Sequence, residues 1–228
     1  FDGAADPDTI NLTGNHAGYQ GQYNSNVGGF EQLAYTAGGN SYAVNYRQTE
    51  TVTDNLIAAG LTINGSSADD SISLGGGQFT VNNATTVLYS GKTDLAIDGQ
   101  AGNDLVTGMT ASTIAAGVLV LSNINTVGNA ANAIATRVNR IELVNISGDV
   151  YIDEVDAIEI GQLDNFSAQL TLANLSGDIT SGSALISGSN LQLQAQNGNI
   201  LLDNNNLLGG QLALSASGNI SLNNLLDT

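Results

Sequence analysis

The sequence predicts an all-β chain wound as a parallel β-helix, on three observations. A phrase of alternating apolar residues, then glycine, a polar residue and another apolar one, recurs four times in the C-terminal half. Successive copies of its glycine are 29, 21 and 20 positions apart; they are Gly148, Gly177, Gly198 and Gly218. The chain has 28 Gly but one Pro and four basic residues. A period near twenty with period-two alternation is typical of a β-solenoid, in which each repeat forms one coil.

The length of the chain sets the size of this predicted fold. At about 21 residues per coil, 228 residues would form about ten coils. The rule for parallel crossovers favours a right-handed winding. We therefore expect a single solenoid over residues 1–228, without a second domain.

Residues 1–110 carry a repeat that begins with aspartate. Asp8–Leu12 returns as Asp70–Leu74 and more loosely as Asp104–Thr107. The stretch before the last two also repeats, as Leu61–Gly65 and Leu95–Gly99, at a spacing of 34. This pattern predicts strand-turn-strand coils with insertions.

The rest of the chain divides into two styles. Residues 111–140 are rich in alanine and repeat poorly, which predicts an irregular transition with a helical turn or wide loop at Ala111–Ala116 and Asn129–Ala135. From 141 to 228 the coils should be regular and rich in leucine. The side chains expected to point inward and stack on their own copies are Leu191, Leu193, Leu201, Leu212, Leu214 and Ile220.

Charge and composition exclude several classes of function. The net charge is −17, which disfavours nucleic acid and anionic membranes as partners. No apolar run is long enough to span a bilayer, so direct membrane insertion is not expected. Cysteine is absent, which excludes thiol catalysis and cysteine-ligated metals. The acidic residues are spread along the chain, where most would be solvated and would attract cations.

Tyrosine is concentrated near the N-terminus. Tyrosine with Gln and Asn on an exposed loop is suited to stacking on a sugar ring or contacting a protein partner. The predicted binding residues are Tyr19, Tyr23, Tyr35, Tyr42 and Tyr46. The alternative is that these rings cover a coil end or an insertion. His16, the only histidine, is expected to lie in a loop.

Two Asp-containing turns suggest a cation site. Gly99–Val106 and, more weakly, Gly65–Ile72 resemble the glycine- and aspartate-rich nonapeptide of haemolysin-type calcium β-rolls. The resemblance implies Ca²⁺ bound between stacked turns by carboxylates and backbone carbonyls. Its ligands here would be Asp69, Asp70, Asn103 and Asp104. Because the two copies are 34 residues apart, an aspartate that only caps its own turn is the alternative.

The sequence does not indicate an enzyme. The densest acidic run, from Asp153 to Glu159, could supply paired carboxylates for glycoside cleavage. Such a site would also need basic groups to hold an acidic sugar, and only His16 and the upstream Arg137 and Arg140 are available. Signatures of serine hydrolases, zinc proteases and phosphate-binding loops are absent. A polysaccharide-acting enzyme is therefore the least favoured alternative.

The regular coils resemble a known family of exported fibres. Leu191–Ala195 with Gly198–Leu202, and Leu212–Ala216 with Gly218–Leu222, resemble the repeats of filamentous haemagglutinin-type exoproteins. The resemblance covers roughly residues 141–228, and the N-terminal part resembles calcium-repeat segments of very large surface adhesins.

The resemblance implies a function at a cell surface. The chain would be a segment of a large secreted or cell-surface adhesin of a Gram-negative bacterium. It would form a rigid stalk for attachment and biofilm cohesion, with its export signal and anchor outside this segment. Its partner would be a glycan or the surface of a host or neighbouring cell. Alternatively, copies of the chain would assemble with cations into a filament, sheath or surface layer.

Overall fold

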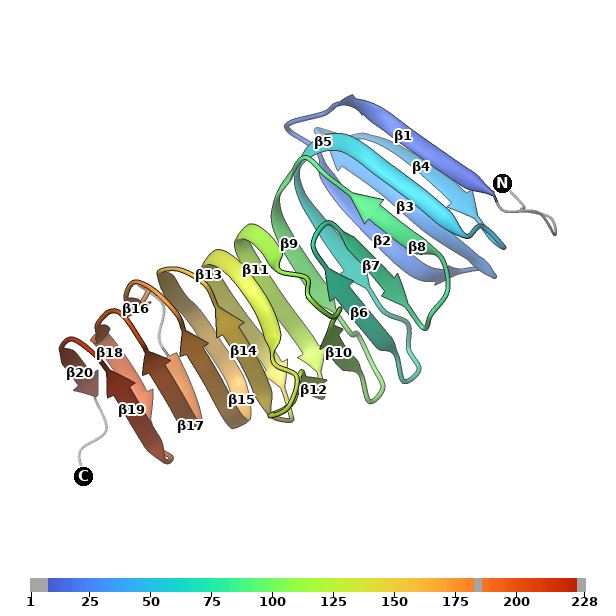
Figure 1. The fold of residues 1–228 in the computed structure, drawn as a ribbon. Coiled ribbons are helices and arrows are strands. Elements are labelled where there is room, and N and C mark those ends of the chain that lie inside the picture. Colours follow the sequence, from blue (N-terminus) through green and yellow to red (C-terminus); the bar gives the residue numbers. More distant parts are fainter. Residues whose placement is uncertain (1–7, 183–185, 225–228) are drawn as a thin grey trace.

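The computed structural model describes residues 8–182 and 186–224, which form twenty strands in one continuous sheet. These residues contain no helix, and hence none long and apolar enough to cross a membrane. The predicted all-β class is confirmed. Figure 1 shows an elongated stack with β1 at one end and β20 at the other.

In the part of the chain that the structure describes, ten strands lie in each half of the stack. In the N-terminal half they are β1 (Thr9–Asn15), β2 (Gln20–Val27), β3 (Phe30–Ala37), β4 (Asn40–Tyr46), β5 (Thr51–Asn64), β6 (Ser71–Gly75), β7 (Gln78–Val81), β8 (Thr86–Tyr89), β9 (Lys92–Asp98) and β10 (Leu105–Gly108). In the C-terminal half they are β11 (Ile114–Ile124), β12 (Thr126–Val127), β13 (Ile134–Ile146), β14 (Val150–Glu154), β15 (Ile158–Asn174), β16 (Ile179–Ser181), β17 (Ile186–Ala195), β18 (Ile200–Leu208), β19 (Leu212–Ala216) and β20 (Ile220–Asn224).

Parallel pairing dominates the C-terminal half. Leu170 pairs with Leu191, and Leu191 pairs with Leu212. A second column joins the isoleucines of the same phrases, Ile179, Ile200 and Ile220, and begins at Ile158. The last three copies of the repeated phrase are therefore stacked in register, as predicted. We call the stretch of chain between a strand and its parallel partner a rung.

The first copy of the phrase is out of phase with the others. Ile141 pairs with Ile160, whereas Val150 is the residue that pairs with Leu170. The expected equivalence of Ile141 with Leu170 is therefore wrong. The spacing of 29 arose because both strands carry the same apolar alternation but belong to different columns.

The N-terminal half is not a uniform stack of parallel rungs. The predicted spacing of 34 is confirmed, since Leu61 pairs with Leu95 in parallel. However, two antiparallel meanders, β2-β3-β4 and β6-β7-β8, are inserted between the parallel strands. Two turns of the first meander are Gly28-Gly29 and Gly38-Gly39, all with positive φ. Glycine permits such two-residue hairpin turns, whose twist matches that of the strands.

The alanine-rich stretch is more regular than predicted. Neither Ala111–Ala116 nor Asn129–Ala135 forms a helical turn, because β11 begins at Ile114 and β13 at Ile134. Only short turns precede these strands. Alternating buried residues such as Leu119 and Leu121 determine β11, and its alanines lie near its N-terminal end.

A long hydrophobic core runs along the stack, and Tyr35, Leu56 and Ala58 form a separate small cluster. The long core extends from Tyr23 to Leu202, with Ile10 and Ala216 packed against its two ends. The predicted inward positions Leu191 and Leu193 are buried. The prediction was wrong at Leu201, which is half-buried, while its neighbour Leu202 is fully buried.

The predicted inward residues of the last rung are less covered. Leu212 is 37% exposed and Ile220 is 48% exposed, although their partners one rung earlier are buried. Leu214 packs partly against the core. No described residue lies beyond this rung to cover its outer side.

The recurring glycine has a steric cause. A Cβ at Gly148 would overlap the carbonyl oxygen of Asn125, and one at Gly198 would overlap that of Gly177. Backbones of successive rungs therefore approach closely at this turn, which only glycine allows.

Candidate functional site

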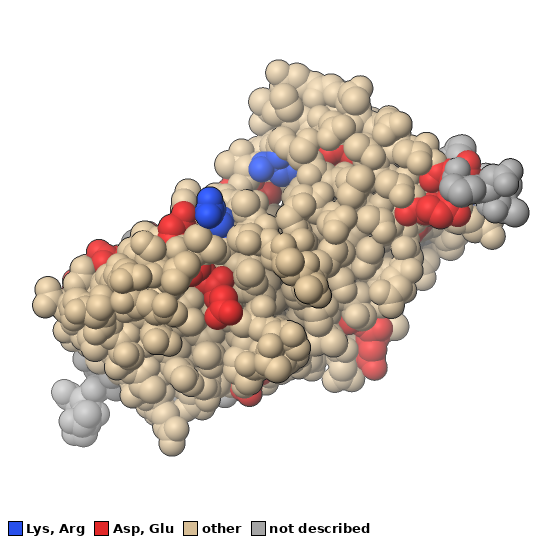
Figure 2. Space-filling view, viewed as in Figure 1, with Lys and Arg blue, Asp and Glu red and all other residues tan. Residues whose placement is uncertain are grey.

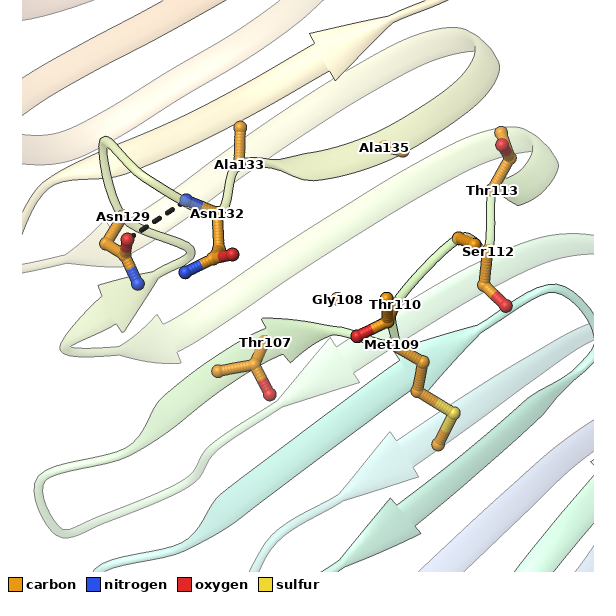
Figure 3. Close-up of a pocket in the computed structure, with 11 residues that line it drawn as sticks. Thr107, Gly108, Met109, Thr110, Ser112, Thr113, Asn129, Asn132, Ala133 and Ala135 are labelled. Atoms are coloured by element: carbon orange, nitrogen blue, oxygen red, sulfur yellow. Dashed lines mark hydrogen bonds between the residues drawn. The ribbon is translucent and has the colours of Figure 1, made fainter.

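One cavity among the described residues is a polar groove on the surface between two turns. It has a volume of about 620 Å³. Figure 3 shows the turn with Asn129 and Asn132 on one side and the turn with Met109 and Ser112 on the other. The groove is lined by Thr107, Gly108, Met109, Thr110, Ala111, Ser112, Thr113, Asn129, Asn132, Ala133 and Ala135.

Local hydrogen bonds hold both turns. Met109 N donates to Leu74 O at 2.6 Å, which fixes the turn at Met109 to β6. The Asn129 side chain accepts from the backbone N–H of Ala131 and of Asn132, both at 3.0 Å. Small side chains around these polar groups leave space for a ligand.

A second cavity, of about 450 Å³, lies on the other side of the turn at Ala130–Ala133. Its wall includes Tyr151, Gln169 and Gln192. Gln169 Nε2 donates to Gln192 Oε1 at 2.9 Å, which links successive rungs. Hydroxyl and amide groups dominate both cavities, and Asp153 is the one ionisable carboxylate among their lining residues. This chemistry suits a neutral polar ligand.

The structure divides the predicted tyrosine site into two groups. Tyr23, Tyr35 and Tyr46 are fully buried, with no exposed surface. The prediction that these three contact a partner is therefore wrong, because the first meander packs their rings into the core. Tyr19 and Tyr42 are half-buried at the surface. The alternative that the rings cover an insertion holds for the buried group.

Burial strongly affects the buried phenols. It raises the pKa of Tyr23, Tyr35 and Tyr46 far above the ordinary value, with nearby carboxylates adding to the effect. Tyr23 OH donates to Glu31 Oε1 at 2.6 Å, and Tyr35 OH donates to Asp54 Oδ2. These phenols therefore act as neutral hydrogen-bond donors within the fold.

Asp54 belongs to a buried ion pair. Lys92 Nζ lies 3.3 Å from Asp54 Oδ2, and both side chains are almost fully buried. Lys92 Nζ also donates to the carbonyl oxygen of Ser90 at 2.9 Å and to that of Leu56. Burial lowers the pKa of Lys92, and Asp54 opposes this shift. The pair joins β5 to the start of β9.

Of the two half-buried tyrosines, Tyr42 lines a third cavity that sequence reasoning missed, and Tyr19 packs against Tyr42. This cavity has a volume of about 370 Å³ and lies between β1 and β4. His16 packs against both tyrosines, with ring centroids 4.9 Å from Tyr19 and 5.3 Å from Tyr42. The lining residues are Asn11, Leu12, Thr13, His16, Tyr42, Val44 and Leu56. The position of the only histidine close to the tyrosine-rich stretch was the available signal.

The predicted calcium ligands do come together across two rungs. Asp104 Oδ1 accepts from the backbone N–H of Asp70 at 2.9 Å, and Asp69 Oδ1 accepts from Asn103 N at 2.8 Å. Asp70 Oδ2 accepts from Ser66 N at 2.5 Å. The aspartates therefore cap turns, both within a rung and between rungs.

One carboxylate oxygen in this group stands out. Asp104 Oδ2 is buried and has no hydrogen-bond partner among the described residues, and Asp104 is 1% exposed. Burial raises the pKa of Asp104, and the carboxylates of Asp70, Asp69 and Asp98 add to this. Ca²⁺ requires six to eight oxygen ligands. No group of three or more His, Cys, Asp or Glu side chains that could hold a metal ion occurs in the described ranges, and calcium binding at these turns stays a prediction.

The acidic run of 153–159 is divided between one buried carboxylate and more exposed ones. Glu154 is buried, and its carboxylate accepts from Thr136 Oγ1 at 2.7 Å and from the backbone N–H of Val138 and Val155. Burial raises the pKa of Glu154, and these hydrogen bonds oppose the shift. The carboxylate oxygens of Glu154 are thus engaged in hydrogen bonds within the fold, whereas Asp153 and Asp156 are exposed.

Comparison of the chain with family models, curated proteins and solved structures finds no significant match. The functional argument therefore depends on the geometry of the chain itself.

Proposed function

We propose that this chain is a segment of a large secreted or cell-surface bacterial adhesin and serves as a rigid stalk for attachment. In its finer description, the fold is a right-handed parallel β-helix of about ten coils with two inserted meanders. The observation that carries the proposal is the long core that runs along the stack, with β1 and β20 at opposite ends (Figure 1). Such an arrangement separates two points in space by a stiff body.

The surface chemistry supports a partner of low charge. The cavities offer hydroxyl and amide groups, which suit a glycan or an uncharged face of a protein. With a net charge of −17, the chain would repel nucleic acid and anionic lipid.

Attachment can be measured on beads. Beads coated with the purified chain should remain on bacterial or host cell layers, or on extracellular matrix, under flow that removes beads coated with an unrelated acidic protein of the same net charge. If the two kinds of bead detach equally from every surface, the adhesin proposal is wrong.

A second candidate is a structural subunit that cations assemble into a filament, sheath or surface layer. Figure 2 favours it in one respect, since carboxylates form several separated patches on this face and basic residues only two small ones. Light scattering in millimolar calcium and after chelation tests this candidate. Growth of particles with calcium, reversed by chelation, would support it. A monomer in both conditions would exclude it.

A further inference from the structure

The cleft between β1 and β4 combines aromatic walls with hydrogen-bonding groups. Tyr42 lines it and stacks on the buried Tyr35, with ring centroids 5.4 Å apart and an interplanar angle of 16°. His16 and Tyr19 meet Tyr42 at its edge of the cleft. Aromatic rings pack against the apolar C–H faces of sugars, and pockets that bind small molecules pair such walls with a few polar groups.

The polar groups of this cleft are available to a ligand. The side chains of Asn11 and Thr13 on β1 are exposed and make no hydrogen bond to any other described residue. The imidazole of His16 has ring contacts but likewise no hydrogen bond within the described part of the chain. Together these groups provide both donors and acceptors on one side of the rings.

The walls of the cleft are held in place before any ligand binds. His16 N donates to Ile57 O at 2.8 Å, and Ala59 N donates to Tyr19 O at 2.9 Å, so the turn is fixed to β5 at two points. Behind Tyr42, Lys92 Nζ lies 5.6 Å above the centre of the Tyr35 ring. A fixed binding surface loses little conformational entropy when the ligand binds.

We propose that this cleft binds a single neutral sugar residue, which stacks on Tyr42 and accepts or donates hydrogen bonds at Asn11, Thr13 and His16. The proposal rests on the adhesin function and names its ligand class. No carboxylate or ammonium group lines the cleft among the residues that the structure describes, so an uncharged ligand fits best. Its volume of 370 Å³ lies near the lower end of ligand pockets, about 300–1,000 Å³, which suits one sugar unit.

The single histidine makes binding directly observable. Because the chain has one histidine, the imidazole C–H signals of His16 are unique in an NMR spectrum. The methyl glycosides of glucose, galactose, mannose and N-acetylglucosamine are titrated, with glucuronic acid as the acidic comparison. At least one neutral glycoside should shift the His16 signals saturably, with a Kd on the order of 1 mM. If none does, or only the acid does, the proposal is wrong.

Matched variants locate the site. Thr13→Val removes one hydroxyl at constant shape and should weaken binding about tenfold. Thr9→Val, on the same strand outside the cleft, should leave the Kd unchanged. Tyr42→Phe should bind like the unmodified chain, because the buried Tyr42 hydroxyl has no partner among the described residues, whereas Tyr42→Leu should lose binding. If Thr13→Val and Tyr42→Leu both retain the affinity, the sugar binds elsewhere.

The same variants separate this inference from the adhesin function. If beads carrying unmodified chain or Thr13→Val adhere equally well and no glycoside shifts His16, the cleft proposal fails and the stalk function stands. If a glycoside binds in the cleft but coated beads never adhere, the adhesin function fails and the sugar site stands.

Discussion

The two halves of the molecule build one continuous stack from different cores. In the N-terminal half, three buried tyrosines and an ion pair lie inside the fold. In the C-terminal half, the interior consists of columns of leucine and isoleucine such as Leu170, Leu191 and Ile200. The parallel ladder runs through both, so the ladder alone does not dictate the contents of the core.

The inserted meanders explain the difference. Thr9 pairs with Thr51 and Leu61 with Leu95, whereas Leu170 pairs with Leu191. The extra chain in each N-terminal rung adds strands that must also be packed, and large aromatic rings fill that volume. The shorter C-terminal rungs are filled mainly by aliphatic side chains. Their backbones approach closely at Gly148 and Gly198, as the N-terminal backbones do at Gly99.

The largest expected effect comes from the buried ion pair of the N-terminal half. Lys92→Met keeps the aliphatic stem but leaves Asp54 buried without its cation, which should cost about 4 kcal/mol in the free energy of unfolding. Urea denaturation measures the loss.

The C-terminal half provides the matched control. Arg140 lies 2.7 Å from Glu142 and 3.3 Å from Glu159, and these side chains are 22–38% exposed. Arg140→Met should therefore cost at most about 1 kcal/mol. Equal losses for the two variants would contradict the view that the buried ion pair contributes more to stability than the partly exposed one.

The next largest effect tests the close approach of C-terminal backbones. Gly198→Ala places a methyl group on the carbonyl oxygen of Gly177, and the required shift should cost about 2 kcal/mol in stability. The N-terminal control is Gly18→Ala, where no atom lies within 4 Å of the added methyl group. It should change the midpoint of urea denaturation very little. A harmless Gly198→Ala would show that the rungs can move apart.

A smaller effect distinguishes tyrosines within the aromatic core. The Tyr46 hydroxyl is buried without a partner in the described part of the chain, so Tyr46→Phe should stabilise the protein by about 1 kcal/mol. Tyr23→Phe loses the hydrogen bond to Glu31 and should destabilise it by a similar amount. Thermal unfolding compares the two. Shifts of the same sign would mean that ring packing, not the hydroxyl, controls both positions.

The sequence predicts the regular half better than the elaborated one. The columns at Leu170, Leu191 and Leu212 follow from local alternation and a constant period, because each coil repeats the environment of the last. The recurrence of the glycine is visible in the sequence. Its cause is contact with a carbonyl oxygen of the neighbouring rung, and this can be found only when the register between the rungs is known. The alternation of apolar residues also gave a wrong prediction at Ile141, because it does not specify which column of stacked residues a strand joins.

The N-terminal site could be predicted only in part. Gly28-Gly29 and Gly38-Gly39 are hairpin signals, but the direction in which Tyr23, Tyr35 and Tyr46 point depends on packing against distant strands. The sugar cleft likewise requires the turn at His16 to dock on β5, through bonds that join residues 40 or so positions apart. Burial and long-range docking are absent from local patterns, so the half-buried and fully buried tyrosines look alike in sequence.

The smallest expected effect concerns Asp104, at the boundary of the two halves. Asp104→Asn keeps the acceptor for Asp70 N and replaces the unpartnered Oδ2 by a neutral amide, so it should stabilise the protein at pH 7 by up to about 1 kcal/mol. Because burial raises the pKa of Asp104 above its unfolded value of about 3.9, the native state binds its proton more tightly.

The stability linked to that proton is fully present below the unfolded pKa and is lost as pH rises through the folded pKa. The advantage of Asp104→Asn should therefore shrink as thermal unfolding is repeated from pH 7 down to pH 4. Asp203→Asn, at an exposed aspartate, is the control and should show little change. Millimolar calcium adds a decisive comparison. If it stabilises the unmodified chain but not Asp104→Asn, the buried carboxylate is a cation ligand after all; if it affects both equally, Asp104 is a turn cap whose charge the fold tolerates at a cost.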